Sequence, residues 1–104
     1  MRHSFAVEEA LIALGQNLKA ARIRRRLTQA IVAERSGISL NTLSKIEKGD
    51  PGIAMANVAS VINALGLIQN LSDLCSYDQD SVGMLMEEKN LPQRVRQKKT
   101  DRAL

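Results

Sequence analysis

The chain has 104 residues, which gives room for one domain and a tail. Hydrophobic residues make up 44% of it, enough for a small core, but the only aromatic residues are Phe5 and Tyr77, which argues against RNA or single-strand binding by base stacking. The single cysteine, Cys75, excludes an internal disulfide and a structural zinc site. Because no apolar run reaches membrane-spanning length and no signal peptide is visible, we expect a cytoplasmic protein with no membrane partner.

The net charge of +4 is distributed unevenly along the sequence. Residues 1–26 contain six Lys or Arg against two Glu, and residues 91–104 contain five against one Asp. Between them, residues 27–60 are neutral, and residues 61–90 contain one Lys against five acidic residues. Two basic ends around an acidic connector are consistent with a polyanionic partner. Solvated faces that merely keep the protein soluble would give the same distribution, so charge alone does not separate the two interpretations.

The first segment has the pattern of a long amphipathic helix. Ser4 is placed to cap its N-terminus. Apolar residues then recur at alternating spacings of four and three, at Val7, Leu11, Leu14, Leu18 and Ala21. We therefore expect a helix from Phe5 to about Arg26.

The next stretch, LTQAIVAERSGISLNTLSKIEKG (residues 27–49), predicts two short helices joined by a tight turn. Thr28 and Ser39 are suited to cap them, because hydroxyl side chains accept the free N–H groups of a first turn. A glycine follows each helix, at Gly37 and at Gly49, as is common at helix C-termini.

Two further helices are predicted after a turn at residues 50–52. One runs from Ile53 to Gly66, which ends it. A short fifth helix follows, with apolar residues Leu67, Ile68, Leu71 and Leu74. This helix offers more apolar surface than a small monomer needs, so we expect a homodimer with Ile68, Leu71 and Leu74 at its interface. Cys75 is interpreted as a small core residue.

A composition break at Tyr77 divides the chain into a predicted domain, residues 1–76, and a linker, short helix and basic tail, residues 77–104. Residues 77–80 are expected to form a polar linker. Residues 81–89 are expected to form a short helix that presents Val82, Leu85 and Met86. Such a face suits a protein partner, with packing back onto the bundle as an equal alternative. Pro92 ends this helix, and residues 93–104 are expected to be disordered when alone.

The spacing within residues 27–49 is distinctive. Counting Gln29 as the first position, Ala33 is fifth, Gly37 ninth, Leu43 fifteenth and Ile46 eighteenth. A small residue lets two helices cross closely, glycine permits a left-handed turn, and Leu43 and Ile46 anchor one face of the second helix. Over roughly residues 14–75, this pattern resembles the helix-turn-helix of the phage Cro and repressor family, or Xre family. An ordinary helical hairpin is the alternative.

The resemblance implies an all-α fold, a five-helix Cro/repressor-like bundle with a short C-terminal helix and a basic tail. It also places the second motif helix in the major groove of DNA. The residues expected to contact bases are Ser39, Leu40, Asn41, Ser44 and Lys45, since Asn can bond adenine and Lys can bond guanine. Thr28, Gln29 and Lys48 are expected to meet phosphates. Arg22 and Glu47 are expected to form a structural ion pair between the first and third helices.

The sequence nominates no catalytic centre. His3 is the only histidine and lies near the N-terminus, and no phosphate loop, zincin motif or paired carboxylates occur. No nucleophile has a candidate base nearby in the sequence. We therefore expect no enzymatic activity, no cofactor and no metal.

The expected function is sequence-specific binding of a double-stranded DNA operator by a homodimeric repressor. The series GDPGIAMANVASVINALGL, an acidic connector and LPQRVRQKK resemble the antitoxin-like regulators encoded beside kinase toxins of the Hip type. That resemblance implies a repressor of its own operon that also binds a toxin kinase. The alternatives are a phage-type or restriction-linked controller without a toxin, and a protein-interaction module that no longer binds DNA. A neighbouring gene that encodes a kinase would discriminate these alternatives.

Overall fold

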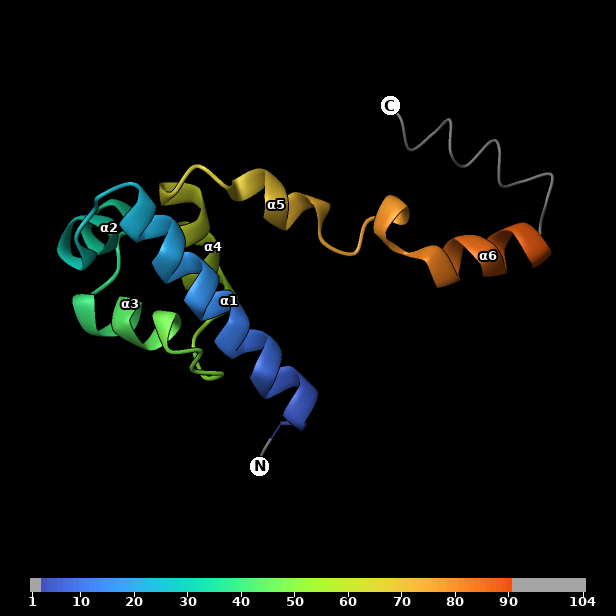
Figure 1. Cartoon of the computed structure of the whole chain (residues 1–104), viewed down its shortest axis with the longest axis horizontal. Coiled ribbons are helices and arrows are strands. Elements are labelled where there is room, and N and C mark those ends of the chain that lie inside the picture. Colours follow the sequence, from blue (N-terminus) through green and yellow to red (C-terminus); the bar gives the residue numbers. More distant parts are fainter. Residues whose placement is uncertain (1–2, 91–104) are drawn as a thin grey trace. The chain divides into compact units, whose positions relative to one another are not determined.

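A computed structural model of the chain describes residues 3–90, which contain helices and turns and no strand (Figure 1). The elements are α1 (Phe5–Arg24), α2 (Gln29–Ser36), α3 (Leu40–Glu47), α4 (Met55–Ala64), α5 (Ile68–Asp73), a 3₁₀ turn η1 (Tyr77–Gln79) and α6 (Ser81–Asn90). The predicted all-α fold with a short C-terminal helix is therefore confirmed. The predicted basic tail and the stop at Pro92 lie outside the described residues. None of the helices described combines the length and the hydropathy needed to cross a lipid bilayer.

The first three helices begin where hydroxyl side chains can satisfy their free N–H groups. Ser4 Oγ accepts from the Val7 N–H at 3.2 Å, Thr28 Oγ1 from Ile31 at 3.1 Å, and Ser39 Oγ from Thr42 at 3.0 Å. Each bond joins a residue to the third one after it, which is the geometry of an N-cap. Local chemistry in the sequence thus fixes the starts of α1, α2 and α3.

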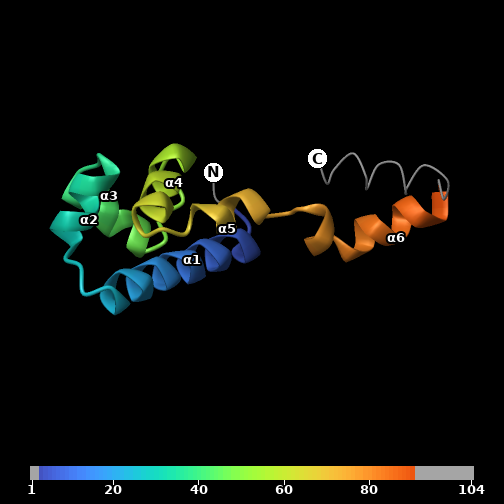
Figure 2. The same ribbon diagram turned by 90° about the horizontal axis from the view of Figure 1, so that it is seen from above.

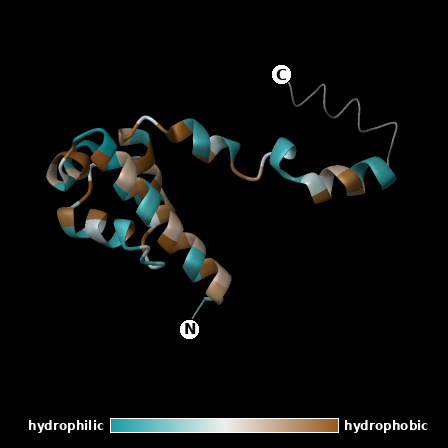
Figure 3. Ribbon diagram, viewed as in Figure 1, coloured by the Kyte–Doolittle hydropathy of each residue, from teal (hydrophilic) through white to brown (hydrophobic). Residues whose placement is uncertain are grey.

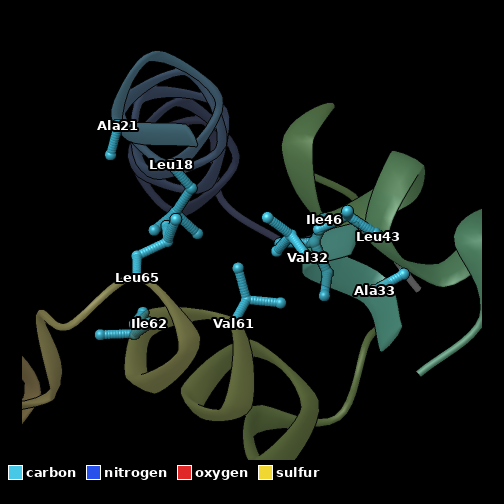
Figure 4. Packing of buried hydrophobic residues seen from close by; sticks show 9 residues of the cluster. All are labelled: Leu18, Ala21, Val32, Ala33, Leu43, Ile46, Val61, Ile62 and Leu65. Carbon is cyan, nitrogen blue, oxygen red and sulfur yellow. The ribbon is translucent and has the colours of Figure 1, made fainter. Parts of the chain in front are cut away.

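The core lies among α1, α2, α3 and α4. Its buried side chains face one another in Figure 4; they are Leu18, Ala21, Val32, Ala33, Leu43, Ile46, Val61, Ile62 and Leu65. Figure 2 shows α2, α3 and α4 on the same side of α1. The predicted stripe of α1 enters this core through its C-terminal half, whereas Val7 at its start is 45% exposed. Small and aliphatic residues fill the core without any aromatic side chain among those buried.

Several element boundaries differ from the prediction. α1 ends at Arg24 rather than near Arg26, because Arg26 has a φ of 56° and cannot continue a right-handed helix. α4 begins at Met55 rather than Ile53: its N-cap, Ala54, offers no side-chain hydrogen bond, while Ile53 packs against the core.

The segment after α5 also differs from the prediction. Within the predicted polar linker, residues 77–79 form a 3₁₀ turn. Cys75 is exposed and has a φ of 59°, so it is not a core residue. This position lies just after the end of α5, and its backbone is left-handed.

The chain divides into two compact units between Leu71 and Ser72. The second unit contains η1 and α6, and α6 begins where Asp80 Oδ1 accepts a hydrogen bond from the Gly83 N–H at 3.0 Å. Along the ribbon of α6, the hydrophobic positions lie together and the C-terminal end is hydrophilic (Figure 3). The sequence-based domain boundary at residues 76 and 77 stays a prediction.

Candidate nucleic-acid interface

Helix α3 is held by one face and bare on the other. Leu43 is 0% exposed and Ile46 is 4% exposed, and the three-residue spacing places both on the side that meets the core. Leu40, Asn41 and Lys45 are exposed on the opposite side, and Lys48 follows at the C-cap. Asn41 and Lys45 are four residues apart, so they are neighbours on the surface of the helix. A helix presented in this way can enter a groove without disturbing its own packing.

The predicted base-contacting residues differ in how exposed they are and in whether their polar groups are already hydrogen-bonded. Ser44 is only half-buried, at the edge of the face. The hydroxyl of Ser39 is occupied in the cap: it accepts from the Thr42 N–H and donates to Thr42 Oγ1 at 2.9 Å. Leu40, which can offer only apolar contact, is 51% exposed. The polar groups best presented for base contacts are therefore those of Asn41 and Lys45.

A buried ion pair joins α1 to the end of α3. The Nε of Arg22 donates to Glu47 Oε2 at 2.7 Å, and its Nη2 donates to Glu47 Oε1 at 3.1 Å. Both residues are buried, and the two-pronged geometry matches a guanidinium to a carboxylate. Arg22 Nη1 also donates to the carbonyl of Leu27 at 3.0 Å, which ties the α1–α2 turn to the same cluster. The structure thus brings together the two residues expected to pair.

Gln29 belongs to this cluster as well. Its side-chain Nε2 donates to Glu47 Oε1 at 2.9 Å. One of its two amide N–H groups is therefore engaged with the carboxylate. Thr28 caps α2 immediately before it, so the first turn of α2 and the last turn of α3 are fixed against each other. Sequence reasoning gave Gln29 a phosphate contact but missed its role in orienting Glu47.

Sequence reasoning also missed Gly15. A Cβ at this position would lie 2.6 Å from the carbonyl oxygens of both Ile46 and Glu47. Similarly, a Cβ on Gly49 would lie 2.6 Å from Ile12 Cα. The backbones of α1 and the C-terminal end of α3 therefore approach each other more closely than any side chain allows. An isolated glycine inside a helical pattern is the available signal for such an approach.

A hollow of about 400 Å³ lies beside this contact. It is lined by Glu8, Ile12, Lys45, Lys48, Gly49, Asp50 and Pro51. Lys45 and Lys48 thus border the same hollow, at the C-terminal half of α3. No group of metal-ligating side chains occurs in the part of the chain that the structure describes.

The predicted dimer residues lie at and beyond the end of the first unit. Ile68 is 39% exposed, Leu71 is half-buried, and Leu74 is 60% exposed. In α6, Val82, Leu85 and Met86 are all exposed.

Two short helices joined by a glycine turn, the second anchored by one face, define a helix-turn-helix protein. The chain belongs to the helix-turn-helix domain family, whose model, described as "Helix-turn-helix domain", matches residues 13–74. No curated protein and no solved structure matches the chain. A domain of this class indicates that DNA is the partner, and such domains are typical of regulators without enzymatic activity.

Proposed function

We propose that this protein is a transcriptional repressor that binds a specific double-stranded DNA operator as a homodimer in the cytoplasm. The observation that carries the proposal is the presentation of α3: Leu43 and Ile46 fix one face, and Asn41 and Lys45 stand exposed on the other. The same element order is found in proteins that place this helix in the major groove. A lone recognition helix covers few base pairs, and two-fold pairing places two of them one helical turn of DNA apart.

Asn41 and Lys45 are assigned to base contacts, with Leu40 against a thymine methyl or the sugar backbone and Ser39 and Ser44 at the edges. Thr28, Gln29 and Lys48 are assigned to phosphates, which position a protein without specifying sequence. The two groups of residues predict different defects. Losing a base contact should relax sequence preference, whereas losing a phosphate contact should weaken binding to every duplex alike.

The decisive experiment is a gel-shift titration of the DNA upstream of the protein's own gene, with a scrambled duplex of equal length, at several salt concentrations. Asn41→Ala and Lys45→Ala should each lose about 1–3 kcal/mol of operator binding while retaining their affinity for the scrambled duplex. Lys48→Ala should weaken both and reduce the salt slope by about one. A thermal melt controls for folding. If folded Asn41→Ala and Lys45→Ala proteins keep the wild-type ratio of the two affinities, α3 does not read sequence.

A narrower proposal concerns a protein partner. We infer that the regulator belongs to the Xre family and is the antitoxin of a Hip-type kinase toxin, which would bind its second unit. Support comes from the exposed Val82, Leu85 and Met86 of α6, which the first unit does not need for its core. A phage-type or restriction-linked controller would have no such partner, and an interaction module would bind protein but not the operator. Co-purification with a kinase encoded by the neighbouring gene separates these possibilities.

A further inference from the structure

Helices α1, α2, α3 and α4 end in the same hydrogen-bonded turn. In each, a residue with a positive φ donates to a carbonyl three residues back, and the next residue donates to a carbonyl five residues back. For α2 these bonds are Gly37 to Glu34 and Ile38 to Ala33, at 3.1 and 3.0 Å. This pattern is the Schellman motif, which requires a left-handed residue. In α2, α3 and α4 that residue is glycine: Gly37, Gly49 and Gly66, with φ values of 71°, 84° and 79°.

Helix α1 places an arginine in the same position. Arg26 donates its N–H to Ile23 at 2.9 Å, Leu27 donates to Arg22 at 3.2 Å, and the φ of Arg26 is 56°. A side chain is disfavoured here because its Cβ lies close to the following carbonyl oxygen. The chain therefore tolerates backbone strain at Arg26 that it avoids with glycine at three equivalent turns. Retained strain of this kind points to a role for the side chain.

No intramolecular contact explains the arginine. Arg26 is exposed, and its guanidinium has no hydrogen-bond or ion-pair partner within residues 3–90. Its neighbour Arg25 differs, because Arg25 Nη1 donates to the carbonyl of Ala21 at 2.9 Å. Arg24 and Arg25 also place like charges beside Arg26, which favours an external anion as the partner of the cluster.

The position of Arg26 identifies the anion. Arg26 lies two residues before Thr28, the N-cap of α2, so the two Cα atoms are at most about 7 Å apart. The turn between them is held to the cluster of Arg22 and Glu47 by the bond from Arg22 Nη1 to Leu27 O at 3.0 Å. The backbone of Arg26 is therefore held in place beside the free N–H groups of α2. These N–H groups face phosphate in the proposed complex.

We propose that Arg26 contacts a phosphate of the operator DNA, next to the phosphate held by the N-terminus of α2. This inference rests on the proposed function and adds a contact that none of the residues assigned above supplies. The contact is independent of sequence, because a guanidinium bonded to phosphate carries no information about the bases.

Arg24 provides a matched control. Successive residues of a helix are about 100° apart, so Arg24 lies about 200° around α1 from Arg22, which faces α3. Arg24 therefore points away from α3, although it carries the same charge two residues from Arg26 and is equally exposed. Arg24→Gln removes one positive charge without removing the proposed contact.

The test measures affinities of the full chain for the operator and for the scrambled duplex as a function of salt. Arg26→Gly should reduce the salt slope by about one and weaken both duplexes fivefold to tenfold at about 0.1 M salt, leaving their ratio unchanged. Its melting temperature should equal or exceed that of the wild type, because glycine relieves the left-handed strain. Arg26→Lys should keep the wild-type salt slope. Arg24→Gln should change the salt slope by less than half of the change that Arg26→Gly causes.

The outcomes separate this inference from the proposed function. If the wild type binds the operator and Arg26→Gly keeps the wild-type slope, the Arg26 contact is wrong and the repressor function stands. If Arg24→Gln and Arg26→Gly lower the slope equally, the effect is general electrostatics and the specific contact is wrong. If the wild type binds no duplex, both the function and the contact are wrong.

Discussion

Replacing Gly15 with alanine sets two opposing effects against each other. Alanine is favoured over glycine inside a helix by about 1 kcal/mol, so propensity alone predicts that Gly15→Ala stabilises α1. The new Cβ, however, would lie 2.6 Å from the carbonyl oxygens of Ile46 and Glu47. Both neighbours are backbone atoms, so neither can rotate away, and α1 must separate from the end of α3.

Forced repacking of this kind costs up to about 3 kcal/mol. After the gain in propensity, we expect Gly15→Ala to lose about 2 kcal/mol of unfolding free energy. For a domain of this size, that loss lowers the melting temperature by about 8–16 °C. The same separation displaces Glu47 relative to Arg22, so operator affinity should also fall in protein that remains folded.

Urea unfolding followed by circular dichroism measures the change, with the m-value confirming that only stability has changed. Ala20→Gly is the matched control: Ala20 is exposed on the same helix, and this variant measures the propensity difference without the close contact. We expect the control to lose about 1 kcal/mol. If Gly15→Ala is instead more stable than the wild type by the amount that the control loses, the close approach of α1 and α3 is refuted.

Three further predictions concern the Arg22–Glu47 ion pair, the apolar residues proposed for the dimer interface and the exposed apolar residues of α6. Glu47→Ala should lose about 3–5 kcal/mol of unfolding free energy in urea, because Arg22 stays buried without its counter-charge. The double variant Arg22→Met with Glu47→Leu should regain most of this loss. A loss under about 1 kcal/mol in the single variant would mean that the pair is effectively solvated. Leu71→Asp should convert the dimer to a monomer in light scattering at micromolar concentration, and a wild type that is already monomeric contradicts the assigned interface. Leu85→Asp should weaken binding of the kinase encoded by the neighbouring gene at least tenfold, as expected for an apolar anchor, and should leave operator affinity unchanged. A parallel loss of operator affinity would assign α6 to DNA binding instead.

Features that depend on neighbouring residues could be predicted from the sequence. The N-caps at Ser4, Thr28 and Ser39, and the turn at Gly37, are set by chemistry within a few positions of the chain. The burial of Leu43 and Ile46 follows from their spacing on one helix. In each case the determining interaction is local or periodic, so one sequence is sufficient to specify it.

Apart from the Arg22–Glu47 pair, which the family resemblance implied, the features that depend on packing between helices could not be predicted. The isolated glycine at position 15 signals a close approach but does not say that the end of α3 makes it. Nothing near Gln29 indicates that its amide faces Glu47, eighteen positions away. The left-handed conformation of Arg26 is a third case, because arginine gives no local signal for it. Cys75 was misassigned because a small, apolar side chain suits a core, whereas the structure leaves it exposed.

The unpredicted contacts of Gly15 and Gln29 meet the predicted Arg22–Glu47 ion pair at one end of α3. The close approach at Gly15, the bonds from Arg22 and the bond from Gln29 act on Ile46 and Glu47, whereas the N-terminal half of α3 is held chiefly by Leu43. Because backbone contact and charged hydrogen bonds tolerate less displacement than aliphatic packing, the direction of α3 is set from its C-terminal end. Asn41 then stands on the part of the helix farthest from that anchor, where a small rotation moves its amide most. Substitutions at Gly15 or Gln29 should therefore impair base contacts at Asn41 more than phosphate contacts at Lys48, although both substituted residues lie outside the bare face of α3.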